Sequence, residues 1–119
     1  MSATQHRSFG TIDVSPRAVV TIVSHAVQQC YGVVGMASKR LVNGIAKLLV
    51  RDPHPGIDVR VEPDGITIDV YVIIEYGVRI RVVAESVQNT IKFHVEQAIG
   101  LPVKAVNVHI QGLRRDEEE

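Results

Sequence analysis

The sequence predicts an α/β protein of the α+β type, in which a small mixed β-sheet carries two main helices packed on one face. Apolar residues recur with the 3.6-residue period of an amphipathic helix at 16–31 and again at 80–98. Apolar and polar residues alternate through 57–75, on both sides of a turn. Another alternating stretch, 105–111, follows the second helical segment, so we expect a further strand there.

The composition indicates one compact domain. The 119 residues are 45% hydrophobic and 22% charged, and thirteen basic residues balance thirteen acidic ones. A domain that bound nucleic acid mainly through phosphate contacts would carry a basic excess. We expect a disordered N-terminus at 1–9, a single domain at 10–113 and a charged C-terminal tail at 114–119.

The domain is expected to begin with a short strand at 10–14 that leads into the first helix. Ser15 is a typical N-cap, and Pro16 suits the first helical position. Gly32 is expected to end the helix as a left-handed cap. The apolar face of this helix comprises Ala18, Val19, Ile22, Val23, Ala26, Val27 and Cys30.

The alternation at 57–75 predicts a β-hairpin with one buried face, and Pro63-Asp64-Gly65 supplies its turn. Tyr71 and Ile73 alternate onto the face opposite the apolar one. We expect them either to be covered by the segment at 40–50 or to form a contact surface. The acidic residues of the hairpin alternate with its buried positions, as on a solvated face: Asp58, Glu62, Asp64, Asp69 and Glu75.

The second helix is expected to end at Gly100, since Pro102 prevents its continuation. A strand, a helix and a strand in this order favour a parallel strand pair joined by a right-handed crossover.

The segment 36–55 is less regular. Its apolar spacing predicts an amphipathic helix at 40–50 that either packs on the core or touches a membrane with a basic face. The sequence DPHPG at 52–56 ends this element.

Motifs for catalysis, cofactors or metals are missing from the sequence. The histidines show neither HxxxH nor HxH spacing, and GxSxG, P-loop and GxGxxG patterns are absent. The single cysteine, Cys30, excludes an intramolecular disulfide and is expected to be a small buried hydrophobe. We therefore expect no enzyme, no cofactor and no metal site. The five histidines are His6, His25, His54, His94 and His109.

Gly32-Val33-Val34-Gly35 matches the GxxG pattern with which KH domains hold a nucleic-acid backbone. Its inner residues are valines, so a strand is the preferred interpretation. The alternative function, a KH-like nucleic-acid-binding accessory protein, would require basic residues gathered on one face, such as Lys39, Arg40, Lys47 and Arg51.

A set of segments is more specific than any one motif. It includes GTIDVS at 10–15, GVVGM at 32–36, DVYVIIEYGVRI at 69–80, VAESVQ at 83–88 and VNVHIQGL at 106–113. Together these segments resemble the alkaline shock protein family of bacterial envelope stress response proteins. The resemblance extends over 10–113.

The resemblance implies a cytoplasmic, non-enzymatic protein of cell-envelope homeostasis, which acts as a scaffold or adaptor through protein–protein contacts. It also implies self-association and a small integral membrane protein as an anchor, so that membrane association would come through a partner. Apolar runs are far shorter than the ~20 residues that span a bilayer, so direct insertion is not expected. The residues themselves suggest Tyr71, Ile73 and Tyr76 as the contact surface.

Overall fold

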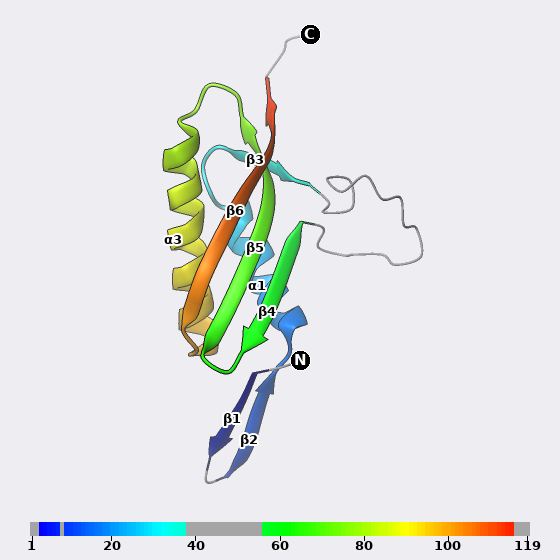
Figure 1. The fold of residues 1–119 in the computed structure, drawn as a ribbon, viewed down its shortest axis with the longest axis vertical. Coiled ribbons are helices and arrows are strands. Elements are labelled where there is room, and N and C mark those ends of the chain that lie inside the picture. The colour runs from blue at the N-terminus through cyan, green and yellow to red at the C-terminus, as the bar shows by residue number, and fades with distance from the viewer. Residues whose placement is uncertain (1–2, 8, 38–55, 116–119) are drawn as a thin grey trace, which may run out of the picture.

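The computed structural model describes residues 3–7, 9–37 and 56–115 and shows a mixed sheet with two helices on one face (Figure 1). This confirms the predicted fold class. The elements in chain order are β1 (Ala3–Arg7), β2 (Gly10–Val14), α1 (Pro16–Gln28), β3 (Val33–Met36), β4 (Ile57–Glu62), β5 (Gly65–Glu75), α3 (Ile80–Ile99) and β6 (Val103–Arg114).

Strand β5 is the centre of the main sheet. It pairs antiparallel with β4, where Val59 faces Ile68, and antiparallel with β3, where Val33 faces Ile74. Strand β6 pairs with β5 in parallel along nearly its whole length. The predicted hairpin and the predicted parallel pair are therefore confirmed, and the GVVG segment enters a strand as preferred.

The first helix begins as expected and ends earlier than expected. The Ser15 hydroxyl accepts a hydrogen bond from the Ala18 backbone N–H at 3.4 Å. The helix ends at Gln28, and Gly32 lies in the turn before β3 with a φ of +88°, so its predicted role as the helix cap is wrong. A Cβ at Gly32 would lie 2.9 Å from Val83 Cγ2. This glycine therefore allows the turn to approach α3.

The second helix agrees with its prediction. It ends at Ile99, and Gly100 is a left-handed cap whose N–H donates to the Glu96 carbonyl at 3.0 Å. The following chain leads directly into β6.

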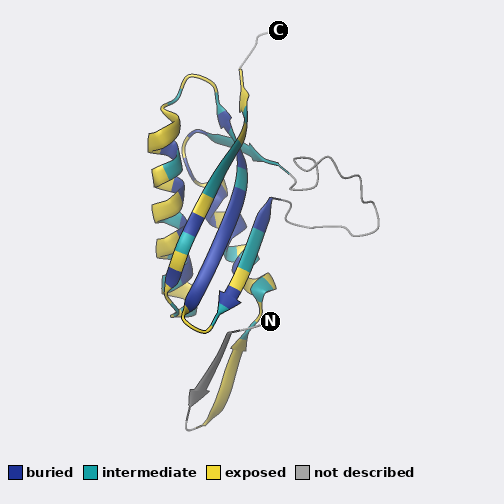
Figure 2. Ribbon diagram, viewed as in Figure 1, coloured by how far each residue is buried: buried dark blue, intermediate teal, exposed yellow. Residues whose placement is uncertain are grey.

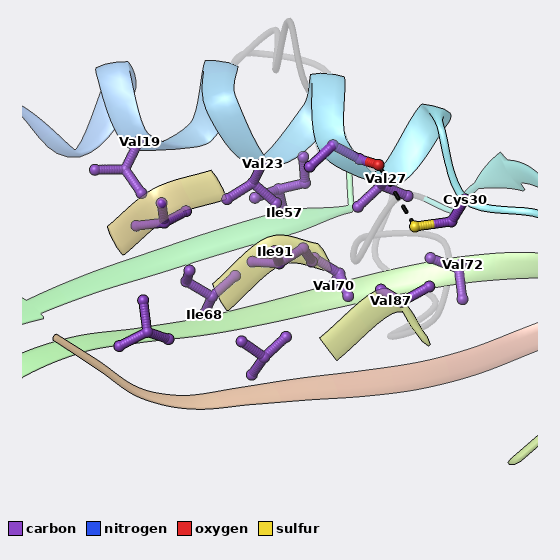
Figure 3. Packing of buried hydrophobic residues seen from close by; sticks show 14 of the residues in the cluster. Val19, Val23, Val27, Cys30, Ile57, Ile68, Val70, Val72, Val87 and Ile91 are labelled. Carbon is purple, nitrogen blue, oxygen red and sulfur yellow. Dashed lines mark hydrogen bonds between the residues drawn. The ribbon is translucent and has the colours of Figure 1, made fainter. Parts of the chain in front are cut away.

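The core lies between the two helices and the inner face of β5 (Figure 3). Most of the predicted apolar face of α1 lies in it, whereas Ala18 of that face is exposed, and Cys30 is buried at its edge. The buried residues of α3 are Val83, Val87, Ile91 and Val95. The largest fully enclosed members of the core are all β-branched: Val19, Val23, Val27, Ile66, Ile68, Val70, Val72, Ile74, Val87, Ile91 and Val95. Branched side chains suit a pleated, buried sheet surface.

The structure differs from the sequence-based prediction at the termini. Ala3–Arg7 was expected to be disordered but forms β1, which pairs antiparallel with β2. This segment lacks an apolar pattern, and main-chain hydrogen bonds across a tight turn pair strands without one. Arg114, assigned to the charged tail, is the last residue of β6. The helix expected at 40–50 lies outside the described residues.

We predict that Val87→Asp unfolds the domain. Val87 is fully buried on α3, so the change removes roughly 1.5–3 kcal/mol of apolar burial and encloses an unpaired carboxylate. Circular dichroism during heating measures the effect. Asn89→Asp is the matched control, because Asn89 is exposed on the same helix. A Val87→Asp protein that melts like the control would contradict the packing of this helix face.

Candidate functional site

The candidate site is the outer face of the sheet, opposite the helices. On β5 this face carries Thr67, Asp69, Tyr71 and Ile73, which alternate with the core residues. Thr67 is 7% exposed and Asp69 is 9% exposed. The expectation that Asp69 belongs to a solvated face is therefore wrong. Figure 2 shows the burial of β5 along most of its length, whereas β6 alternates between buried and exposed residues.

Asp69 is the hub of a group of polar side chains that we call the outer-face cluster: Arg60, Asp69, Tyr71, Asn107 and His109. Arg60 Nη1 donates to Asp69 Oδ2 at 3.2 Å. Asn107 Nδ2 donates to Asp69 Oδ1 at 3.1 Å, and His109 Nε2 lies 3.0 Å from the same oxygen. An ionised carboxylate only accepts hydrogen bonds, so His109 Nε2 is the donor in this contact.

The surroundings of Asp69 favour its ionised form. Burial alone would raise the pKa of this carboxyl. The hydrogen bonds from His109 and Asn107, together with the charge of Arg60, outweigh burial and hold the pKa below its usual value. The carboxylate is thus a fixed negative charge whose oxygens are already occupied by neighbours, rather than a free acid or base.

Tyr71 connects this cluster to the predicted contact surface. Its ring stacks on the ring of His109, with centroids 4.5 Å apart and planes 13° apart. His109 is also bonded to Asp69, so the His109 ring is held both by the stack and by this hydrogen bond.

The other two predicted surface residues occupy different positions. Ile73 is half-buried on the same face as Tyr71 and lies opposite Gly112 of β6. Tyr76 lies beyond the end of β5, is 55% exposed and has the Arg115 guanidinium 4.8 Å from its ring centroid. The structure thus brings Tyr71 and Ile73 onto one face and places Tyr76 past its end. Their role as a contact surface stays a prediction.

A second group of ions borders this face near the hairpin turn. Lys104 Nζ lies 2.9 Å from Glu62 Oε1 and 3.3 Å from Asp64 Oδ1, and Thr67 donates to Glu62 at 3.3 Å. The hydrogen bond from Lys104 lowers the pKa of Glu62, and the bond to Glu62 raises the pKa of Lys104. The charged side chains of Lys104, Glu62 and Asp64 are open to solvent, so these ion pairs orient the edge of the face more than they stabilise the fold.

Sequence analysis did not identify Asn107, His109 or Arg60 as members of one cluster. Asn107 and His109 alternate on the last strand, and Arg60 alternates on the first strand of the hairpin. The expected parallel pairing of the last strand with β5 was the available signal, since it places residues of both strands on a common face. The missing information was the register.

The alternative chemistries have less support. Gly32–Gly35 runs into β3 rather than joining two helices, so it does not present a KH-type loop. The basic residues Lys39, Arg40, Lys47 and Arg51 lie outside the described residues. Within the described ranges, no three His, Cys, Asp or Glu side chains gather as a metal site. Neither of the helices that the structure describes is long and apolar enough to cross a membrane.

We predict that Asp69→Asn destabilises the protein at neutral pH and flattens its acid sensitivity. A hydrogen bond to a charged group contributes roughly 1.5–3 kcal/mol to stability, so removal of the charge should lower the free energy of unfolding. Because the folded pKa of Asp69 lies below its unfolded value, the stabilisation is present above about pH 4 and is lost as the pH falls through the folded pKa. Urea unfolding between pH 2 and pH 7 measures both effects.

Glu85→Gln is the matched control, because Glu85 is exposed and pairs with the exposed Arg81 one helical turn away. An acid profile of Asp69→Asn that parallels those of the wild type and the control would contradict the role given to the Asp69 carboxylate.

Comparison with known proteins identifies the family. A family model described as the alkaline shock protein 23 family, cell envelope-related function, matches residues 4–115. The Bacillus subtilis protein YloU is 40% identical over 116 residues, which are 96% of this chain and 97% of the relative. The Streptococcus pyogenes protein Spy1614 is 35% identical over 107 residues, 88% of each chain.

A solved structure of a MamM CTD variant superposes with a TM-score of 0.49 at 15% identity, over 85% of this chain and 95% of that one.

The family match covers nearly the whole sequence, and the resemblance seen in the sequence is thereby confirmed. The chain belongs to the alkaline shock protein 23 family, whose function is related to the cell envelope.

Proposed function

We propose that this protein is a non-enzymatic scaffold or adaptor of the cell envelope, which acts through protein–protein contacts on the outer face of its sheet. The observation that carries the proposal is the arrangement of that face. Both described helices cover the opposite face (Figure 1), while the outer face holds a rigid aromatic pair beside Ile73. The cell envelope relation of the family supports the place of action.

The chemistry of the outer face suits recognition of a protein. Interface centres are enriched in tyrosine and poor in free charges, with polar groups around them. Tyr71 and Ile73 provide the apolar centre, and the Lys104 ion group provides a polar rim. The charge of Asp69 is compensated by its neighbours, so a partner would not have to bury an unpaired carboxylate.

The preorganisation of this face also favours binding. Tyr71 is held by His109, and His109 is held by Asp69. Side chains that are ordered before association lose less conformational entropy when a partner arrives. The ordering of these side chains before binding therefore favours a tight complex with a partner.

Two partners follow from this proposal. One is a second copy of the chain, since a face with both apolar and polar parts can complement itself. The other is a small integral membrane protein, which would hold the scaffold at the envelope. One double variant, described next, tests whether either partner uses this face.

We predict that Tyr71→Lys combined with Ile73→Lys yields a folded protein that has lost contacts through this face. Lysines would place uncompensated charges at the apolar centre of the interface. Light scattering at several concentrations measures self-association, and co-purification from cells measures the membrane partner.

The matched control is Val82→Lys with Phe93→Lys, which adds two lysines at exposed apolar positions of α3. An unchanged oligomer and unchanged partners in the Tyr71/Ile73 variant would rule out this face. A variant that melts well below the control would show instead that the face is covered within the chain.

The scaffold proposal also predicts that the protein binds nucleic acid only weakly and without sequence preference. The net charge is +0, and phosphate binding needs a basic excess on one face. Filter binding of single-stranded RNA and duplex DNA at several salt concentrations measures this. Tight binding that falls steeply with salt would favour the KH-like alternative over the scaffold.

A further inference from the structure

The hairpin of β1 and β2 extends away from the rest of the protein. It projects past the end of the main sheet, on the side where β4 ends (Figure 1). Phe9, at the hairpin tip, is 102% exposed, and Ile12 in the middle of β2 is 49% exposed. A two-stranded hairpin is marginally stable by itself in water. We therefore expect another surface to cover the exposed residues of this hairpin.

The pairing of the hairpin leaves one side of β2 for another strand. In the described part of the chain, β1 and β2 form a sheet of their own, separate from the four-stranded sheet. An edge strand is a template for main-chain pairing with a second chain. The residues of β2 are exposed from Gly10 to Asp13, so a neighbour can approach along the strand.

A pocket lies close to the base of the hairpin. It has a volume of about 330 Å³ and is lined by Pro16, Val59, Arg60, Val61 and Glu62. Pro16 is two residues after the last residue of β2, so the pocket and the hairpin are joined through one short connection. The proline and the two valines thus give the pocket an apolar part, next to the point where the hairpin leaves the protein.

We propose that two copies of the protein pair their β2 strands antiparallel about a twofold axis at Ile12. In this register Ile12 faces its own counterpart, and Phe9 of each copy faces Ser15 of the other. Ser15 directly precedes Pro16, so the exposed aromatic ring of each tip reaches the pocket at the base of the partner's hairpin. One contact thus covers both the exposed middle and the exposed tip.

The register is self-complementary, as a twofold interface requires. Thr11 faces Asp13 of the second copy, so no two like charges oppose each other along the strand. The contact is limited to short strands and one seated ring, and this is less than a standard interface buries. We therefore expect a dimer that forms in a concentration-dependent way.

The hairpin dimer and the outer-face proposal are tested at different residues. Arg60 and Glu62 line the pocket and also belong to the outer face, whereas Ile12 does not. The hairpin contact leaves Tyr71 and Ile73 available, because they lie on the outer face of the main sheet rather than on β2. Its failure and the failure of the outer-face proposal are consequently separate results.

The test exploits the meeting of residue 12 with itself. In the full chain, Ile12→Lys alone and Ile12→Glu alone would each oppose two like charges, so each should weaken dimerisation roughly tenfold or more. An equal mixture of the two variants should recover the dimer, since lysine then faces glutamate. Sedimentation velocity over a concentration series measures all three samples, and circular dichroism verifies that each variant stays folded.

A covalent probe gives a second readout. Ile12→Cys should form a disulfide-linked dimer under mild oxidation, because directly opposed residues of an antiparallel pair have Cβ atoms at bridging distance. Asn89→Cys, an exposed position on α3, is the matched control and should not be linked. The native Cys30 is buried and contributes equally to both proteins.

Three results would overturn the proposal: a wild type that is monomeric at every concentration, a mixture of charged variants that does not recover the dimer, or equal cross-linking of Ile12→Cys and Asn89→Cys. Loss of dimerisation in Tyr71→Lys with Ile73→Lys, and not in the Ile12 variants, would assign self-association to the outer face instead.

Discussion

Strand β5 has β6 on one side and β3 with β4 on the other, so it is enclosed by the sheet, and its residues are buried on both faces along most of its length. The inner face meets this constraint with branched aliphatic residues that pack against α1 and α3. The outer face meets it with polar residues, and these must find partners because an unsatisfied buried polar group is costly. The neighbouring strands supply the partners.

The polar side chains of the outer face link neighbouring strands of the sheet. Asp69 needs donors from two different strands, Arg60 of β4 and both Asn107 and His109 of β6, so it ties three strands together through side chains as well as main chain. No buried side-chain nitrogen or oxygen atom lacks a hydrogen-bond partner among the described residues. A fully satisfied network of this kind favours one register over its neighbours.

Three features of the described structure lie in different places. The helices lie on one face of the sheet, the outer-face cluster on the other, and the β1–β2 hairpin projects beyond one end (Figure 1). The two proposed contacts are centred on different residues, Ile12 on the hairpin and Tyr71 on the outer face. Two separate contact surfaces of this kind are what the proposed scaffold function requires.

The sequence by itself determined the two helices, the hairpin and the core faces, because amphipathic periodicity and turn residues are local properties of the chain. It also pointed to the family. Tertiary structure alone decided that Asp69 is buried, since its partners Asn107 and His109 lie 38 and 40 residues away and reach it only through the register of β5 with β6. The same holds for β1, whose pairing with β2 depends on main-chain hydrogen bonds that leave no pattern in a polar sequence. Alternation specifies which face a residue takes, but the register specifies which residues meet.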